Sequence, residues 1–388
     1  MVSSGACPSS VPRLWRVRFA APAVVSALAL AVAGATSAAA VSAPAAAVSA
    51  PAAAAPQGTA AVHVGNNPGA IAVDPRTGDV FVARLNNTVS VISGRTNRVI
   101  ATVRVGDYPK AIAVSPRGGQ VYVANLAGGT VSVISGRTDR VVATVRVGNE
   151  PGAIAVSRRT GDVYVANLGS NTVSVISGRT DRVVATVRVG RTPWAVAVSP
   201  RTGDVYVPAV DSGTVSVISG KTDQLVTTVR VGTDPDAIAI SPKNGDIYVP
   251  NTASGTLSVI CGQTNKVIAT RWLGHDLAGI AVSPRTGDVY VPNSASRLVS
   301  VISGQTDEVI AAVRVGIGPT GVTVNPRTGD VYVPNASSGT VSVISGQTSK
   351  VTVNLRVGIG ISQLAVNRRT GAVYVSNGNV DTVTVIEG

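Results

Sequence analysis

Short runs of β-branched and small apolar residues alternate with glycine-rich turns through most of the chain, and the pattern recurs with a fixed period. A Val-Gly pair marks each repeat, with Leu273 replacing the valine once. The spacing between pairs is 42 residues, except for 41 in the first interval; the glycines are at positions 65, 106, 148, 190, 232, 274, 316 and 358. Self-similarity of this kind predicts an architecture in which each repeat packs against its neighbours.

A single repeat, residues 149–190, predicts four short strands. They are residues 153–156 (AIAV), 163–166 (VYVA), 172–176 (TVSVI) and 183–189 (VVATVRV). Both faces of these strands are largely apolar, so each sheet must be covered on both sides. Radial stacking provides that cover, and the sequence therefore predicts an all-β, eight-bladed β-propeller of four-stranded antiparallel blades. A linear β-solenoid is the alternative, and it would need capped ends.

The strands of the last blade are expected to come from both ends of the chain. The last repeat stops after its third strand, and residues 59–64 have the pattern of a fourth strand. His63 takes the position that arginine holds in six repeats: Arg104, Arg146, Arg188, Arg230, Arg314 and Arg356. We therefore expect the N-terminal strand to complete the last blade and close the ring.

The first 57 residues differ in composition from the rest. Arg13, Arg16 and Arg18 precede an apolar stretch at 20–35, and small residues follow at 38–40, an order typical of a secretory signal peptide. We predict a signal peptide at 1–40, an Ala/Pro/Ser-rich linker at 41–57 and the propeller at 58–388. The protein is then secreted and extracellular, associated with the cell wall or not, and has no integral membrane segment after signal removal. A retained membrane anchor is the alternative.

Charge adds an expectation about partners. Residues 58–388 hold 30 basic and 20 acidic residues, because the first 57 contain three arginines and no acid. A net positive surface attracts polyanions such as nucleic acid or a cell-wall polymer. Many of the arginines fall in the PRTGD and SGRTD turns, which we expect on one face of the ring, the bottom. Turn chemistry with solvated Arg/Asp pairs is the alternative explanation of these arginines. We expect a monomer.

The repeated pentapeptides resemble those of a known family. VYVAN at 121–125 and 163–167, VYVPN at 289–293 and 331–335, and VYVSN at 373–377 are similar to the motif of the YVTN-repeat β-propellers. The resemblance covers residues 59–388 and implies a propeller fold. That family and the lactonase-like propellers near it include surface-layer, periplasmic and secreted proteins of mixed function. Many of them have seven blades, whereas eight are expected here.

Candidate site residues lie where the repeats differ from one another. The loops that follow the Val-Gly pairs, and those between second and third strands, should share the top face of the ring. Trp194 and Tyr108 would offer stacking surfaces there, and acidic and basic groups would offer polar contacts. The candidate ligand-binding residues are Arg84, Tyr108, Lys110, Glu150, Arg191, Trp194, Asp234, Asp236, His275 and Asp276. Neutral variation in exposed loops is the alternative explanation.

These features favour a binding or interaction protein that engages a cell-envelope polymer, a protein or a small ligand at the top of the channel. The alternative is an enzyme of lactonase or lyase type that uses the same channel mouth. Such an enzyme would need His275 and Asp276 buried and convergent with Asp234 and Glu150. The chain has no G-x-S-x-G motif, and its acidic residues match no recognised metal-ligand spacing, so we assign no catalytic residue, metal or cofactor.

Overall fold

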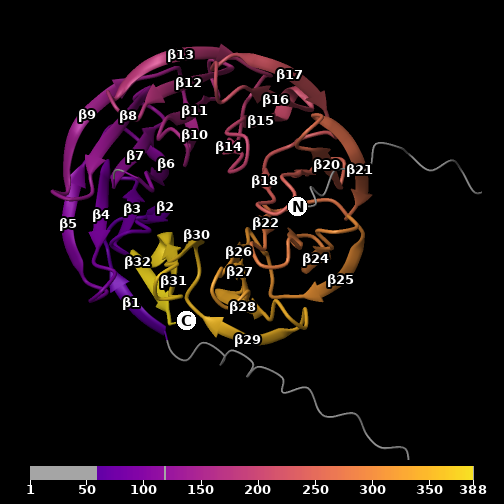
Figure 1. The fold of residues 1–388 in the computed structure, drawn as a ribbon. Coiled ribbons are helices and arrows are strands. Elements are labelled where there is room, and N and C mark those ends of the chain that lie inside the picture. The colour runs from indigo at the N-terminus through magenta and orange to yellow at the C-terminus, as the bar shows by residue number, and fades with distance from the viewer. Residues whose placement is uncertain (1–58, 118, 388) are drawn as a thin grey trace, which may run out of the picture. The chain divides into compact units, whose positions relative to one another are not determined.

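The computed structural model describes residues 59–117 and 119–387, which form eight four-stranded antiparallel sheets arranged as blades around a ring (Figure 1). The predicted all-β, eight-bladed propeller is confirmed. The described helices are two short 3₁₀ turns, η1 (Val210–Ser212) and η2 (Gly378–Val380). None of the helices in this part of the chain is long and apolar enough to cross a bilayer. The predicted signal peptide and linker lie outside the described residues.

Each blade runs from an inner strand at the channel to an outer strand at the rim. The inner strands are β2 (Pro68–Val73), β6 (Pro109–Val114), β10 (Pro151–Val156), β14 (Ala197–Val198), β18 (Ala239–Ile240), β22 (Ala281–Val282), β26 (Thr323–Val324) and β30 (Ile361–Val366). The second strands are β3 (Val80–Arg84), β7 (Gln120–Asn125), β11 (Val163–Asn167), β15 (Val205–Ala209), β19 (Ile247–Asn251), β23 (Val289–Asn293), β27 (Val331–Asn335) and β31 (Val373–Asn377).

The two remaining positions of each blade follow the same order around the ring. The third strands are β4 (Thr88–Ile92), β8 (Thr130–Ser135), β12 (Thr172–Ser177), β16 (Thr214–Ile218), β20 (Thr256–Cys261), β24 (Leu298–Ile302), β28 (Thr340–Ile344) and β32 (Thr382–Ile386). The outer strands are β5 (Val99–Arg104), β9 (Arg140–Arg146), β13 (Arg182–Arg188), β17 (Leu225–Arg230), β21 (Lys266–Trp272), β25 (Val309–Arg314), β29 (Val351–Arg356) and β1 (Thr59–His63).

Burial follows the position of a strand within its blade. Second strands such as β11 are buried at every residue, while outer strands such as β13 are exposed at most positions. Eight buried clusters each join two neighbouring blades; one of them packs Tyr122 and Val133 of the second blade against Val165 of the third. The apolar character of both strand faces is therefore explained by packing between blades.

The inner strands are not alike, although the repeats predicted eight similar ones. Four of them are six residues long, and four, β14, β18, β22 and β26, have only two residues. The blades with short inner strands are those whose second strand contains proline: Pro208, Pro250, Pro292 and Pro334. The other blades have Ala83, Ala124, Ala166 or Ser376 at that position.

The backbone geometry explains this difference. The carbonyl of Pro208 accepts a hydrogen bond from the amide of Trp194 at 3.1 Å, so this residue faces the inner strand. Proline has no amide hydrogen to donate back, and a bond of the strand ladder is lost. Residues 194–196 therefore leave the sheet before β14 begins, and the same holds in the next three blades.

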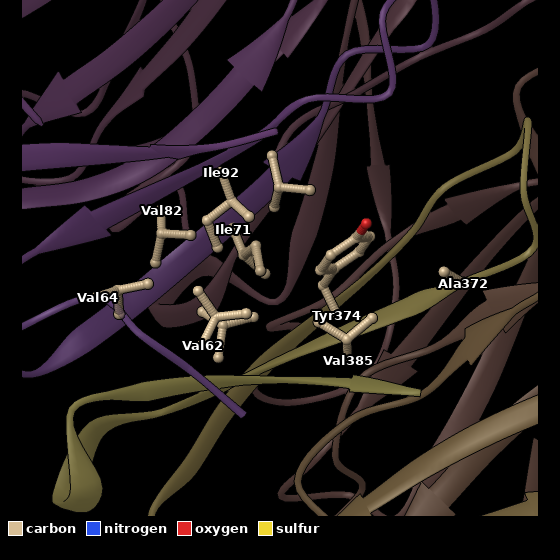
Figure 2. Packing of buried hydrophobic residues seen from close by; sticks show 10 residues of the cluster. Val62, Val64, Ile71, Val82, Ile92, Ala372, Tyr374 and Val385 are labelled. Atoms are coloured by element: carbon tan, nitrogen blue, oxygen red, sulfur yellow. The ribbon is translucent and has the colours of Figure 1, made fainter. Parts of the chain in front are cut away.

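The last blade takes its strands from both ends of the described chain. β1 pairs antiparallel with β32, with Val62 opposite Val383, and β32 continues the sheet to β31 and β30. Val62 and Val64 are buried with Ile71 and Val82 of the first blade and Tyr374 of the last (Figure 2). The N-terminal strand thus lies at the rim, between the first and last blades (Figure 1).

Candidate functional site

The large residues that interrupt the repeat gather around one cavity at the top of the channel. The position after the repeat proline, or after the residue that replaces it, carries Gly69, Lys110, Gly152, Trp194, Asp236, Ala278, Thr320 and Ser362. The next position is alanine or glycine in every repeat except the last, which has Gln363. Lys110, Trp194, Asp236 and Gln363 all line the same cavity of about 570 Å³. The cavity is thus built from the departures from the repeat rather than from its constant residues.

The wall of the cavity combines aromatic, aliphatic and polar groups. Tyr108 and Trp194 line it and expose 43% and 47% of their surface. Aliphatic side chains complete the wall: Ile112, Leu126, Ile154 and Leu168. A concave, mostly apolar site with a few polar groups of both charges is typical of small-molecule binding.

The loop that presents Tyr108 has an unusual backbone. The second residue after each Val-Gly pair has positive φ in all eight repeats, and Asn67, Asp234, Asp276, Gly318 and Gly360 suit that conformation. Tyr108 (φ 54°), Glu150 (φ 53°) and Thr192 (φ 55°) are poor residues for it. Strained residues persist only where the surroundings enforce them, and they cluster at functional sites.

Asp236 is the acidic group of the cavity. Burial raises the pKa of its carboxyl to about 6, and the nearby charge of Asp234 acts in the same direction. Its Oδ1 atom is inaccessible to solvent and has no hydrogen-bond partner among the described residues. A polar atom left in this state lowers stability unless a further group satisfies it. The carboxyl changes its charge close to neutral pH, so it can either accept or donate a hydrogen bond there.

The structure brings together four of the ten predicted site residues: Tyr108, Lys110, Trp194 and Asp236. Glu150 lies at a separate cavity of about 610 Å³ on the outer loops. Arg191, His275 and Asp276 are exposed, and Asp234 is half-buried; none of the four lines the cavity of Tyr108 and Trp194. His275 Nδ1 lies 3.1 Å from the carbonyl oxygen of Ala253.

Arg84 has a structural environment. Its side chain is buried, with 8% exposure, and its Nη1 donates to the carbonyl of Val64 at 2.6 Å. Ser90 Oγ donates to the same carbonyl. In other blades this position holds asparagine, such as Asn167, which bonds Thr172 and Ser174 of its own blade. Burial lowers the pKa of the Arg84 guanidinium, whereas the charge of Asp381 raises it. Arg84 therefore fastens the N-terminal strand to the first blade.

Sequence reasoning missed several lining residues. Gln363 carried a usable signal, because it is the one large side chain in a position otherwise held by alanine or glycine. Leu126 and Leu168 gave no signal, since each follows the repeated asparagine as an ordinary apolar residue. Over residues 59–117 and 119–387, no group of three or more His, Cys, Asp or Glu side chains is arranged to hold a metal ion.

Comparison with known proteins adds support for the fold. No protein-family model and no curated protein sequence matches the chain. Among solved structures with a similar fold is a chain of Kuenenia stuttgartiensis hydrazine synthase. It is 19% identical, the match covers 72% of this chain and 96% of that chain, and the TM-score is 0.56. At this identity the likeness shows the shared propeller fold alone.

Proposed function

We propose that the protein is a secreted binding propeller that holds a sugar unit of a cell-envelope polymer in the cavity of Tyr108 and Trp194. The observation that carries the proposal is the gathering of Lys110, Trp194, Asp236 and Gln363, which all depart from the repeat, around one cavity. In a ring of near-copies, drift in exposed loops would scatter such changes around the channel. Secretion rests on the signal-like segment at 1–40, and the YVTN-repeat resemblance is consistent with it.

The chemistry of the wall supports a saccharide. Exposed aromatic rings offer flat apolar surfaces that pack against the apolar face of a sugar ring. Lys110, Asp236 and Gln363 supply donors and acceptors for hydroxyl groups. The volume of about 570 Å³ lies within the range of small-molecule sites, which is about 300–1,000 Å³.

The enzyme alternative has no geometric support in the described residues. It needs His275 and Asp276 buried beside Asp234 and Glu150, but His275 and Asp276 are exposed. Glu150 lines a different cavity from the one that Trp194 and Asp236 share. We therefore propose binding and not catalysis at the channel mouth.

Tryptophan fluorescence tests the proposal directly. Trp15, Trp194 and Trp272 are the tryptophans of the chain, so a Trp15→Phe/Trp272→Phe variant reports on Trp194 alone. Titration with oligosaccharides prepared from cell-envelope polymers should change its emission in a saturable way. Lys110→Gly, which restores the small residue of other repeats, should weaken binding about tenfold, the effect of losing about 1.4 kcal/mol.

Thr320→Gly is the matched control, because Thr320 holds the same repeat position but does not line the cavity. It should leave binding unchanged. Emission that responds to none of the oligosaccharides would contradict the proposed ligand class. An equal loss in the control would place the ligand elsewhere.

A further inference from the structure

Two arginines interrupt the repeat at the other end of the channel. Six repeats place proline at the start of the turn after the inner strand: Pro75, Pro116, Pro200, Pro242, Pro284 and Pro326. The third and eighth repeats have Arg158 and Arg368 instead. Proline presets the backbone of a turn, so its replacement gives up rigidity that six repeats keep.

The two arginines lie where two cavities meet. One cavity, of about 260 Å³, is lined by residues of the eighth, first, second and third blades. The other, of about 470 Å³, is lined by residues of the third to eighth blades. Arg158 and Arg368 line both. Their side chains therefore mark the boundary between the cavities at the bottom of the channel.

No carboxylate offsets these charges. The lining of both cavities contains no acidic residue and no basic residue besides the two arginines. Neither guanidinium has a hydrogen bond or ion pair with the described residues, whose one ion pair is Arg271–Glu308. The adjacent Arg159, in contrast, donates to the carbonyl of Thr202 in the next blade at 2.8 Å.

The two guanidinium groups affect each other. Both side chains remain open to solvent, yet desolvation by the channel wall and the positive charge of Arg158 both lower the pKa of Arg368. Like charges that face one another without a counter-charge are unfavourable. A doubly charged anion between them would turn repulsion into two attractive, charge-assisted contacts.

We propose that Arg158 and Arg368 form a binding site for a small phosphate monoester at the bottom mouth of the channel. Guanidinium presents paired donors that match phosphate oxygens, and two such groups match a dianion. Val156, Ile238 and Ile240 line the larger cavity and provide an apolar surface for the organic part of the ester. The site lies at the opposite end of the channel from the proposed sugar site and does not depend on it.

Isothermal titration calorimetry tests the site, with phenyl phosphate and inorganic phosphate as probes for the full-length protein at constant ionic strength. We expect saturable binding with one site per chain. Arg158→Gln and Arg368→Gln should each weaken binding at least tenfold, and the double variant should abolish it. Arg158→Pro and Arg368→Pro should do the same while restoring the turn residue of six repeats, so a loss of fold would not mimic the result.

The control is Arg137→Gln/Arg179→Gln, which removes the same charge from exposed turns that line neither cavity. It should change the dissociation constant less than twofold. Absence of saturable binding to either phosphate probe would overturn the proposal. So would an equal loss in the control, which would indicate general attraction to a basic surface. Tighter binding of succinate than of phosphate would reject the assigned ligand class.

Discussion

Tyr108 occupies a backbone conformation that favours glycine or asparagine, and it points an exposed ring into the cavity wall. A non-glycine residue in the left-handed region costs about 1–2 kcal/mol. Tyr108→Gly should therefore raise the free energy of unfolding by about 1 kcal/mol while weakening ligand binding. Urea unfolding and the Trp194 fluorescence titration measure the two effects separately.

Glu150→Gly is the paired variant, because Glu150 has the same conformation but lines a different cavity. It should stabilise the protein to a similar degree and leave binding intact. If both variants were destabilising, the positive-φ positions would not be strained. If both weakened binding, the cavity of Tyr108 would not be the site.

The carboxyl of Asp236 makes stability depend on pH. Its folded pKa, about 6, lies above the usual value of 3.8, so folding disfavours the charged form. This destabilisation is complete above about pH 6 and disappears as the pH falls towards 4. Asp236→Asn should therefore melt at a higher temperature than the parent protein at pH 7.5, and the difference should shrink at pH 4. Thermal melts across this range would contradict the assignment if the difference were constant.

At the scale of elements, tyrosines of the second strands link neighbouring blades. The hydroxyl of Tyr164 donates to Asp223 of the next blade at 3.2 Å, and Tyr374 of the last blade donates to Asn97 of the first at 2.9 Å. Burial and nearby carboxylates raise the pKa of Tyr206 to about 12, which keeps its hydroxyl a donor at neutral pH. The first blade lacks this link because it has Phe81 in the tyrosine position.

Asp139 occupies the corresponding acceptor position for Phe81 in the second blade, and burial followed by the charge of Asp79 raises the pKa of its carboxyl. Phe81→Tyr should supply the missing hydroxyl and stabilise the protein by about 1 kcal/mol. A hydroxyl favours the carboxylate over the neutral acid, so the gain should be larger at pH 7 than at pH 3. Chemical unfolding at the two pH values measures it; a gain that is larger at pH 3 would contradict the predicted bond.

Prolines of the second strands set the length of the inner strands. Pro292→Ala restores an amide donor opposite β22, and residues 278–281 should then exchange their amide hydrogens several-fold more slowly. Ala166→Pro is the reverse variant and should speed exchange in β10. Hydrogen exchange read by mass spectrometry distinguishes these peptides. Unchanged rates in both variants would mean that another feature sets strand length.

The elements that the sequence predicted best are those with the strongest pattern. Apolar runs and glycine turns located four strands per blade, but the parse treated all inner strands as equal, because it overlooked the missing amide of Pro208 and its counterparts. Variation among loops found Trp194 and Lys110, yet it also suggested His275, because variation does not reveal the direction of a side chain. The expected Arg/Asp pairs in the bottom turns are not observed: Asp162 accepts from the amide of Gly178, and Arg201 donates to the carbonyl of Lys243.

For the whole molecule, ring closure depends on the N-terminal strand. Deleting residues 1–57 should leave the melting temperature unchanged. Deleting residues 1–65 removes β1 together with the buried Val62 and Val64, and it leaves β32 with an exposed edge. An unpaired edge promotes aggregation, so this variant should aggregate or melt at a much lower temperature. Thermal melts and size-exclusion chromatography compare the two; equal behaviour would show that the ring closes without β1.

The sheet shared by the two chain ends also constrains how the protein can be made. Asn67 donates to Asp381, 314 residues away, and the first strand synthesised pairs with the last. Contacts so distant in sequence carry a high entropic cost when they form early, so they form late in folding. The chain therefore cannot reach its native state while its C-terminus is still on the ribosome. A polypeptide with this delay stays unfolded during synthesis, the form in which a chain can be threaded through a narrow translocation pore.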